Sequence, residues 1–276
     1  MQISVLMSVY KAEKHLYLER ALQSVWDDQT FKPSEIVLIA DGPLTQELDA
    51  IIDRWKALLG EALVVCRNET NLGLTKSLNI GLQYVHYDLI ARMDSDDISH
   101  PQRFEKQRAF LISHPDIDVV GGALQEFNDE NPCLNIRHYP EDPDATKKYI
   151  RKASPLAHPT VMMRKSIFDS GLKYDERYRT SQDIALWYDV LSQGYKISNL
   201  ADVTIFFRLT DDVYKRRSKQ KAINEFKIYM RGIYRLNGIF TLAYFYPISR
   251  LLFRLMPTSV IKWVYGSALR KKLLYK

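Results

Sequence analysis

Cysteine is scarce in this sequence, and so are signals for export. The 276 residues include two cysteines, Cys66 and Cys133, whose spacing fits neither a metal site nor a disulfide framework. The sequence opens without the charged segment, apolar stretch and small-residue cleavage site of a secretory signal peptide. We therefore expect two reduced thiols and a cytoplasmic protein.

Glycine-rich phosphate loops are absent as well. Neither G-x-G-x-x-G nor G-x-x-x-x-G-K-[ST] occurs, which removes the main support for a Rossmann dinucleotide-binding protein or a P-loop NTPase. The chain length and a hydrophobic content of 46% are sufficient for one large core, so a disordered protein is also excluded.

Acidic residues are rare in the last quarter of the chain. Residues 1–207 contain 23 basic and 30 acidic side chains, a net charge of −7, whereas residues 208–276 contain 16 and 3, a net charge of +13. A basic surface confined to one end indicates an anionic partner, either nucleic acid or a phospholipid surface, and composition does not choose between them.

The C-terminal segment, residues 239–276, is both basic and apolar, but it has no uninterrupted apolar run. Pro247 and Pro257 break it, and Arg250 and Arg254 fall inside its apolar pieces, so it does not suit a membrane span. Short helices with an apolar face and cationic flanks suit an anchor at a membrane surface. The alternative is a basic helical cap packed on the domain.

Short apolar runs alternate with helical patterns in the first half, as is typical of βα units around a mostly parallel sheet. We predict strands at residues 3–9, 35–40, 62–67, 88–93 and 118–122, and helices at 13–26 and 74–85. Farther along, the sequence predicts a loop at 131–144, a short strand at 158–164 and a helix at 183–194 ended by Gly194.

An acidic corner follows the strand predicted at 88–93. Asp94, Asp96 and Asp97 place three carboxylates within four residues, with no cation adjacent to them. Ligands of open α/β sheets bind beyond the carboxyl ends of the strands. Carboxylates there can hold Mg²⁺ or Mn²⁺ while substrate phosphates provide further ligands, so the corner predicts a site for a metal and a diphosphate.

Helix capping is the alternative explanation of this corner. Ser99 and Gln102 have the spacing of a capping box, Pro101 suits a first helical turn, and a preceding aspartate complements the helix dipole. Capping accounts for Asp97 but leaves the other two aspartates unexplained.

A second polar segment stands at the entrance of the helix predicted at 74–85. It contains Asn71, Gly73, Lys76 and Asn79, and backbone N–H groups at a helix start favour anions. An ordinary turn explains the segment equally well.

Six segments, in order, are similar to a known family: ISVLMSVYKAEKHL, LIADGP, NLGLTKSLNIGL, ARMDSDDISHPQRFEKQ, PLAHPTVMMRKSIF and SQDIALWYDVL. Together they resemble a family 2 glycosyltransferase of the bacterial surface-polysaccharide kind, over roughly residues 1–210. The resemblance implies an α/β GT-A fold, with a mostly parallel sheet flanked by helices, in residues 1–212. Residues 213–276 would form a basic, amphipathic helical tail.

The resemblance also implies residue roles. Asp96 would bind the cofactor, Mn²⁺ or Mg²⁺, and Asp183 would be the general base, with a helix N-cap as the alternative for Asp183. His158 would lie on the acceptor side, with an ordinary loop histidine as the alternative. The nucleotide-sugar site would be formed by Val9, Tyr10, Glu13, Asp41, Lys76, Asp94 and Ser95.

The chain departs from the family pattern at Ser8, Lys11, Ala40 and Gln182, where proline, asparagine, aspartate and glutamate are usual. It also lacks the histidine that many relatives place after the last strand. Asp211, Asp212 or water could replace that histidine as metal ligand. Lys215, Arg216 and Arg217 are candidates for contact with the diphosphate, with a solvated basic face as the alternative.

The reaction that the resemblance implies is inverting and metal-dependent. A sugar would move from a nucleotide-diphosphate donor, most often a UDP-sugar, to a hydroxyl of a lipid-linked saccharide in O-antigen, capsule or exopolysaccharide synthesis. The expected partners are the donor, that acceptor and an anionic membrane surface, without nucleic acid. We expect a cytoplasmic enzyme held peripherally on the inner face of the cell membrane.

Two other functions compete with this one. A nucleotidyltransferase would need a glycine-rich basic loop after the first strand, and SVYKAEKHL is not such a loop. The basic tail would permit a non-catalytic membrane or nucleic-acid adaptor on the same fold, but the presence of both Asp96 and Asp183 argues against an adaptor.

Overall fold

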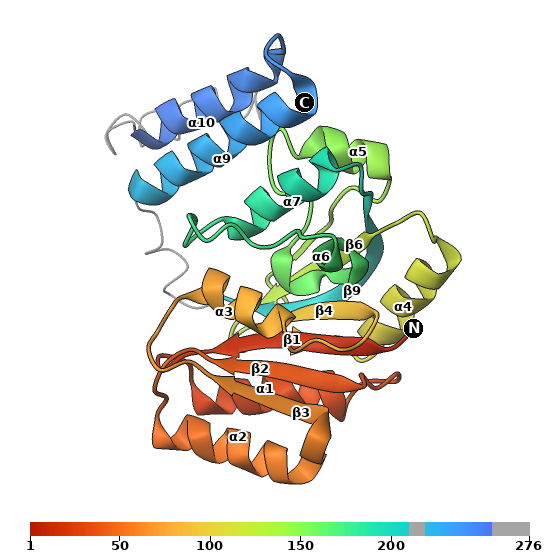
Figure 1. Ribbon diagram of the computed structural model, residues 1–276, viewed down its shortest axis with the longest axis vertical. Coiled ribbons are helices and arrows are strands. Elements are labelled where there is room, and N and C mark those ends of the chain that lie inside the picture. Colours follow the sequence, from red (N-terminus) through yellow and green to blue (C-terminus); the bar gives the residue numbers. More distant parts are fainter. Residues whose placement is uncertain (210–218, 256–276) are drawn as a thin grey trace.

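The computed structural model describes residues 1–209 and 219–255, and its sheet runs through the middle of the molecule (Figure 1). Four parallel strands form one half of the sheet in the order β3-β2-β1-β4. These strands are β1 (Ile3–Val9), β2 (Glu35–Ala40), β3 (Leu63–Arg67) and β4 (Leu89–Asp94).

The other half of the sheet is mixed. Its strands are β5 (Ile98–Ser99), β6 (Val119–Phe127), β7 (Asn135–Arg137), β8 (Met162–Arg164) and β9 (Ile197–Arg208). β8 is antiparallel to both β4 and β6, and β9 is parallel to β6. The predicted parallel sheet is therefore confirmed for the first four strands, while the later pairings are mixed.

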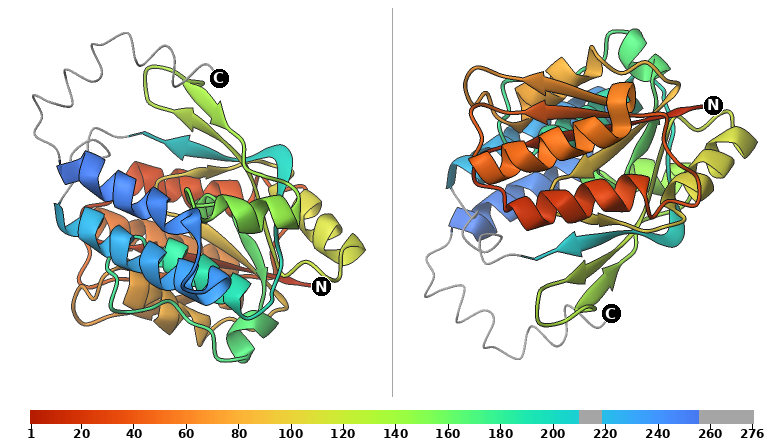
Figure 2. Two further views of the ribbon diagram at one scale, coloured as in Figure 1. Left: turned by 90° about the horizontal axis from the view of Figure 1, so that it is seen from above. Right: turned by 90° about the horizontal axis from the view of Figure 1, so that it is seen from below.

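Helices cover both faces of the sheet, as the two views of Figure 2 show. α1 (His15–Trp26), α2 (Gln46–Leu59) and α4 (Arg103–Ser113) pack on one face. α3 (Leu74–Leu82), α6 (Ser166–Asp169), α7 (Gln182–Ser192) and α9 (Lys219–Asn237) pack on the other. α5 (Pro143–Tyr149) and α10 (Phe245–Leu255) lie at the α9 end of the molecule (Figure 1).

The central strands are apolar because both of their faces are covered. In β1, Ile3, Val5 and Met7 belong to the core under α1 and α2, whereas Leu6 belongs to the core under α3 and α7. All four side chains are fully buried. A parallel strand buried on both sides has a continuous apolar sequence rather than an alternating one, which is why the sequence located these strands well.

Several predicted boundaries are wrong. The strand predicted at 118–122 is β6, which extends to Phe127, and the helix predicted at 74–85 ends at Leu82. The predicted loop at 131–144 contains β7 and the start of α5, whose first turn is capped by Asp142 Oδ1 accepting from the Ala145 N–H at 2.8 Å. The strand predicted at 158–164 is a strand only from Met162, because the short helix η2 (His158–Thr160) precedes it.

The first C-terminal helix, α9, is part of the folded core. Ile228, Tyr229 and Ile233 are buried, and a Cβ placed on Gly232 would lie 2.2 Å from the Tyr188 ring of α7. α9 therefore lies directly against α7, and α10 packs along α9 (Figure 1). Within residues 1–209 and 219–255, no helix has the length and apolar content needed to cross a bilayer.

Candidate active site

An open cleft lies at the carboxyl ends of β1, β2 and β4. These strand ends are on the left of Figure 1. The strand register explains the position, since Ser8 pairs with Asp94, and Val9 pairs with Ala40. The cleft has a volume of about 390 Å³. The predicted site residues on its wall are Tyr10, Glu13, Asp41, Asp94, Ser95 and Asp96.

Asp41 is fixed at the start of α3. Its carboxylate accepts hydrogen bonds from the Leu72 N–H at 2.8 Å, the Gly73 N–H at 2.9 Å and the Asn68 side-chain amide at 2.9 Å. The backbone N–H groups that were predicted to bind an anion at this helix start therefore already donate hydrogen bonds to a carboxylate of the protein. This arrangement holds Asp41 rigidly at the edge of the cleft.

Gly42 lets the loops that follow β2 and β3 approach each other. Its φ of +87° lies in the left-handed region, and a Cβ there would be 2.7 Å from the backbone nitrogen of Asn71. No other residue type fits this position without moving the loop that presents Asp41.

Glu13 and Ser95 join the loop after β1 to the acidic corner. The Ser95 hydroxyl donates to Glu13 Oε2 at 2.7 Å. Tyr10 is 45% exposed at the cleft, whereas the Val9 side chain is fully buried and Val9 does not line the described cleft. Lys76 is exposed on the first turn of α3, away from the described cleft wall.

The three aspartates of the corner converge. Asp94, Asp96 and Asp97 each offer one oxygen, and these oxygens lie within 4.8 Å of one another. Asp97 is buried, and its Oδ2 has no hydrogen-bond partner, while its Oδ1 accepts from the backbone N–H of Arg208 at 2.9 Å. A buried acceptor without a donor is costly unless a cation or water completes it.

Electrostatics support a cation at the same place. Burial, and next the negative charges of Asp94 and Glu13, raise the pKa of Asp96 to about 7. Burial, followed by the charges of Asp94 and Asp96, also raises the pKa of Asp97 well above its ordinary value. Converging hard oxygen donors that repel one another fit a divalent cation such as Mg²⁺ or Mn²⁺.

The capping alternative for this corner is wrong. α4 begins at Arg103, its N-cap residue Gln102 makes no side-chain capping bond, and Ser99 lies in β5. Asp97 is instead tied to β9 through Arg208.

Two arginines of the site were not predicted from the sequence. Arg92 is buried on β4 and forms an ion pair with Asp94, but its Nε and Nη1 have no partner among the described residues. Arg208, at the end of β9, donates from Nε to the Asp96 carbonyl at 3.0 Å and lies over the Tyr17 ring at 3.9 Å. Arg92 could have been noticed as a charge inside an apolar strand, whereas no local pattern places Arg208 beside the aspartates.

Asp183 lies in the first turn of α7 and is half-buried. The N-cap residue is Ser181, so the capping alternative for Asp183 is wrong. Burial raises the pKa of Asp183, while the Ile184 N–H and the charges of Arg92 and Lys221 act in the opposite direction. Asp183 is not on the described cleft wall, but the charge of Arg92 lowers the pKa of both Asp183 and Asp96.

His158 lies behind this region rather than in the cleft. It is 8% exposed, its Nε2 is 2.9 Å from the Tyr174 hydroxyl, and its ring meets Trp187 edge-on. Burial, aided by the charge of Arg92, lowers the pKa of His158 well below its ordinary value. The remaining candidates, Lys215, Arg216, Arg217, Asp211 and Asp212, lie outside the described residues.

Comparison with known proteins agrees with this geometry. The profile of "Glycosyl transferase family 2" matches residues 4–172. The "Amylovoran biosynthesis glycosyltransferase AmsE" of Erwinia amylovora is 36% identical over 263 residues, 95% of this chain and 97% of the relative. The "UDP-Gal:alpha-D-GlcNAc-diphosphoundecaprenol beta-1,3-galactosyltransferase" of Escherichia coli is 32% identical over 274 residues, 99% of this chain and 98% of the relative.

Solved structures share the fold. S. aureus TarS 1-349 in complex with UDP superposes with a TM-score of 0.63 at 19% identity, covering 99% of this chain and 77% of that one. The mannosyltransferase PcManGT from Pyrobaculum calidifontis, in complex with GDP-Man and Mn²⁺, gives a TM-score of 0.66 at 13% identity. The match covers 97% of this chain and 80% of that one. The expected GT-A fold and family are thereby confirmed: the chain belongs to glycosyl transferase family 2 and is a glycosyltransferase.

Proposed function

We propose that this glycosyltransferase transfers a sugar from a UDP-sugar to a hydroxyl of a lipid-linked saccharide, with inversion and with a divalent cation, in the synthesis of a bacterial surface polysaccharide. The observation that carries the proposal is the convergence of Asp94, Asp96 and Asp97, since Asp94 and Asp96 line the same cleft as Asp41. The names of the Erwinia and Escherichia relatives support the class of substrate and product.

The nucleotide would occupy the wall formed by the loops after β1 and β2. Tyr10 offers an exposed ring for stacking, and the fixed carboxylate of Asp41 can accept from a uracil N–H. The hydrogen bond between Ser95 and Glu13 joins this wall to the acidic corner. Asp94 lines the cleft and completes the proposed set around the ribose and phosphates. Val9 and Lys76 do not line the described cleft, and their place in the proposed set rests on the family resemblance alone.

Asp96 is the proposed direct ligand of the cation, with Asp94 and Asp97 beside it. When bound, Mn²⁺ or Mg²⁺ supplies positive charge against the negative charge that develops on the departing diphosphate. Arg208 fixes this corner from β9 through the Asp96 carbonyl and the Asp97 carboxylate.

Asp183 is the proposed general base. Its carboxylate would take the proton of the acceptor hydroxyl as that oxygen forms a bond to the anomeric carbon. The bond from the same carbon to the diphosphate oxygen breaks on the opposite face, and its electron pair leaves with the diphosphate. An α-linked donor would therefore give a β-linked product. His158 is proposed as part of the acceptor-side wall behind Asp183.

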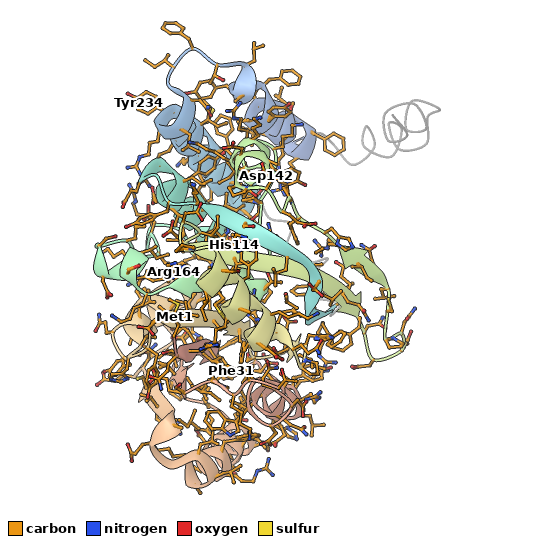
Figure 3. All side chains as sticks on the ribbon, turned by 90° about the vertical axis from the view of Figure 1, so that its right-hand side faces the viewer. Met1, Phe31, His114, Asp142, Arg164 and Tyr234 are labelled. Atoms are coloured by element: carbon orange, nitrogen blue, oxygen red, sulfur yellow. The ribbon has the colours of Figure 1, made fainter. Side chains whose placement is uncertain are left out.

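The C-terminal helices offer a surface for the membrane that would carry the acceptor. Phe240 is 99% exposed and Leu242 is 92% exposed, and both lie in the segment between α9 and α10. Tyr234 of α9, labelled in Figure 3, marks this end of the molecule. The outward face of α10 continues the patch with Phe245, Ile248 and Leu252, which are 70%, 44% and 59% exposed. We propose that this apolar tip, residues 239–252, binds an anionic cytoplasmic leaflet together with the basic tail. We also propose that the chain consists of a glycosyltransferase domain, residues 1–212, and a basic helical tail, residues 213–276.

A transfer assay tests the proposal. The full chain is incubated with Mn²⁺, a synthetic lipid-diphosphate-linked saccharide and, in turn, each member of a panel of UDP-sugars, and the product is analysed by NMR. We expect transfer from a UDP-sugar with inverted anomeric configuration. Retained configuration, or transfer only from donors carrying another nucleotide, would contradict the proposal.

A further inference from the structure

Ser181, which immediately precedes α7, has an unusual backbone conformation. Its φ of 62° and ψ of 22° place it in the left-handed region, and it is the one non-glycine residue of the described chain with a positive φ. A residue with a Cβ is strained there and keeps this conformation only when its surroundings impose it. Because Ser181 stands two positions before Asp183, its backbone angles set the direction in which α7 starts.

The segment before Ser181 is anchored to α3. The Thr75 hydroxyl of α3 donates to the Tyr178 carbonyl at 2.7 Å, which fixes the chain at residue 178. Arg179 and Thr180 then follow as exposed residues, and Gln182 is buried. Ser181 therefore lies between two exposed residues and the start of α7.

The hydroxyl of Ser181 has a partner on α9. Its Oγ lies 3.4 Å from Oε1 of Glu225, a carboxylate that is 5% exposed. The other oxygen, Oε2, lies 3.2 Å from Arg250 and 2.9 Å from Arg254, both on α10. These two ion pairs neutralise the buried carboxylate, although its Oε2 accepts no hydrogen bond among the described residues. Its Oε1 accepts the hydrogen bond of the Ser181 hydroxyl.

We propose that Glu225 is a positioning residue, which fixes the left-handed backbone of Ser181 and thereby aims Asp183. Because Arg250 and Arg254 of α10 pair with Glu225, the orientation of Asp183 depends on how α10 packs. The packing of α10 therefore affects the turnover of the transferase. The inference rests on the proposed role of Asp183 as general base, and it assigns a role in turnover to helices outside the nucleotide-binding half of the fold.

A pair of variants at one position isolates the backbone effect. Ser181→Ala and Ser181→Gly both lose the hydroxyl, but only glycine adopts the left-handed conformation without strain. We expect Ser181→Ala to lower kcat about 10- to 100-fold, the range of a misplaced catalytic group. KM for the UDP-sugar should stay within about twofold, and Ser181→Gly should lose far less activity than Ser181→Ala.

Glu225→Ala provides the rescue test. It should lower kcat as Ser181→Ala does, and the double variant Ser181→Gly/Glu225→Ala should recover most of the loss, because the backbone then needs no partner. Arg235→Met is the matched control: it breaks an ion pair of α9 with Asp189 of α7 without touching Ser181, and kcat should not change. Circular dichroism and thermal melts establish that each variant is folded.

The outcomes separate this inference from the proposed function. Equal activity of Ser181→Ala and Ser181→Gly, or a Glu225→Ala loss that glycine fails to rescue, would overturn the positioning role. If Asp183→Asn transfers sugar as fast as wild type, the general-base assignment fails, and the inference fails with it. If Asp183→Asn lowers kcat, adding Ser181→Ala to that variant should lower kcat only slightly further. If kcat instead falls by the same factor that Ser181→Ala causes in wild type, the inference is overturned while the proposed function stands.

Discussion

Asp183 combines a fixed helix-start position with a carboxyl that is half-buried, and both properties suit a general base. Burial raises its pKa, so the acidic limb of the activity profile should lie at higher pH than an exposed aspartate would give. Asp183→Asn keeps the shape but cannot accept the proton. We predict that kcat falls at least about 10²-fold while calorimetry shows donor binding largely unchanged. Wild-type rates in this variant would remove Asp183 from the mechanism.

Asp96 gives a prediction about stability. In the protein without metal, its pKa is raised to about 7 from an ordinary value of 3.8, so the folded state binds this proton more tightly than the unfolded chain does. The free energy of unfolding should therefore fall as pH rises between these two values. Asp96→Asn cannot ionise and should escape this loss.

Thermal melts across that pH range measure the effect. In EDTA above neutral pH, Asp96→Asn should melt higher than wild type, by about 2–4 °C for each kcal/mol of relieved repulsion. At about pH 4 the two proteins should melt alike, because wild-type Asp96 is then protonated. Added Mn²⁺ should stabilise wild type only. A constant difference between the two proteins at every pH would show that Asp96 does not carry this charge effect.

At the scale of elements, the loops after β2 and β3 meet at Gly42. We predict that Gly42→Ala destabilises the protein by about 1–3 kcal/mol, since alanine is strained at positive φ and its methyl would collide with the backbone of Asn71. UDP binding should weaken as well, because Asp41 adjoins the displaced loop. Gly60→Ala is the control, with a φ of +55° but open space around its Cβ, and it should leave UDP binding intact. Equal UDP affinity in wild type and Gly42→Ala would contradict this account of the loop.

How far the sequence predicts an element depends on how the element is buried. β1, β2 and β4 are covered on both faces, and their continuous apolar runs located them within one residue. β7 is exposed along its whole length and has no such run, so it was predicted as loop. Arg208 stabilises the acidic corner through hydrogen bonds with Asp96 and Asp97. These partners are more than one hundred residues apart in the sequence, so no local pattern predicts the bonds. The aspartates themselves stand together in sequence, which is why the corner was predicted and its supports were not.

For the molecule as a whole, the apolar tip and α2 lie at opposite ends (Figure 1). We predict that the full chain sediments with anionic liposomes, and that Phe240→Ser combined with Leu242→Ser weakens this binding at least about tenfold, because two exposed apolar side chains no longer enter the lipid. Leu58→Ser is the control, since Leu58 is 66% exposed on α2, at the other end. Loss of binding in the control, or none in the tip variant, would reject this surface.

The central claim is that one cleft joins a nucleotide to a divalent cation at Asp96. Titration calorimetry of UDP, with Mn²⁺ and then with EDTA, tests it on wild type and Asp96→Ala. We predict that UDP binds wild type tightly only when Mn²⁺ is present, and that Asp96→Ala binds equally weakly in both conditions. UDP affinity that is the same with EDTA, or undiminished in Asp96→Ala, would contradict the account.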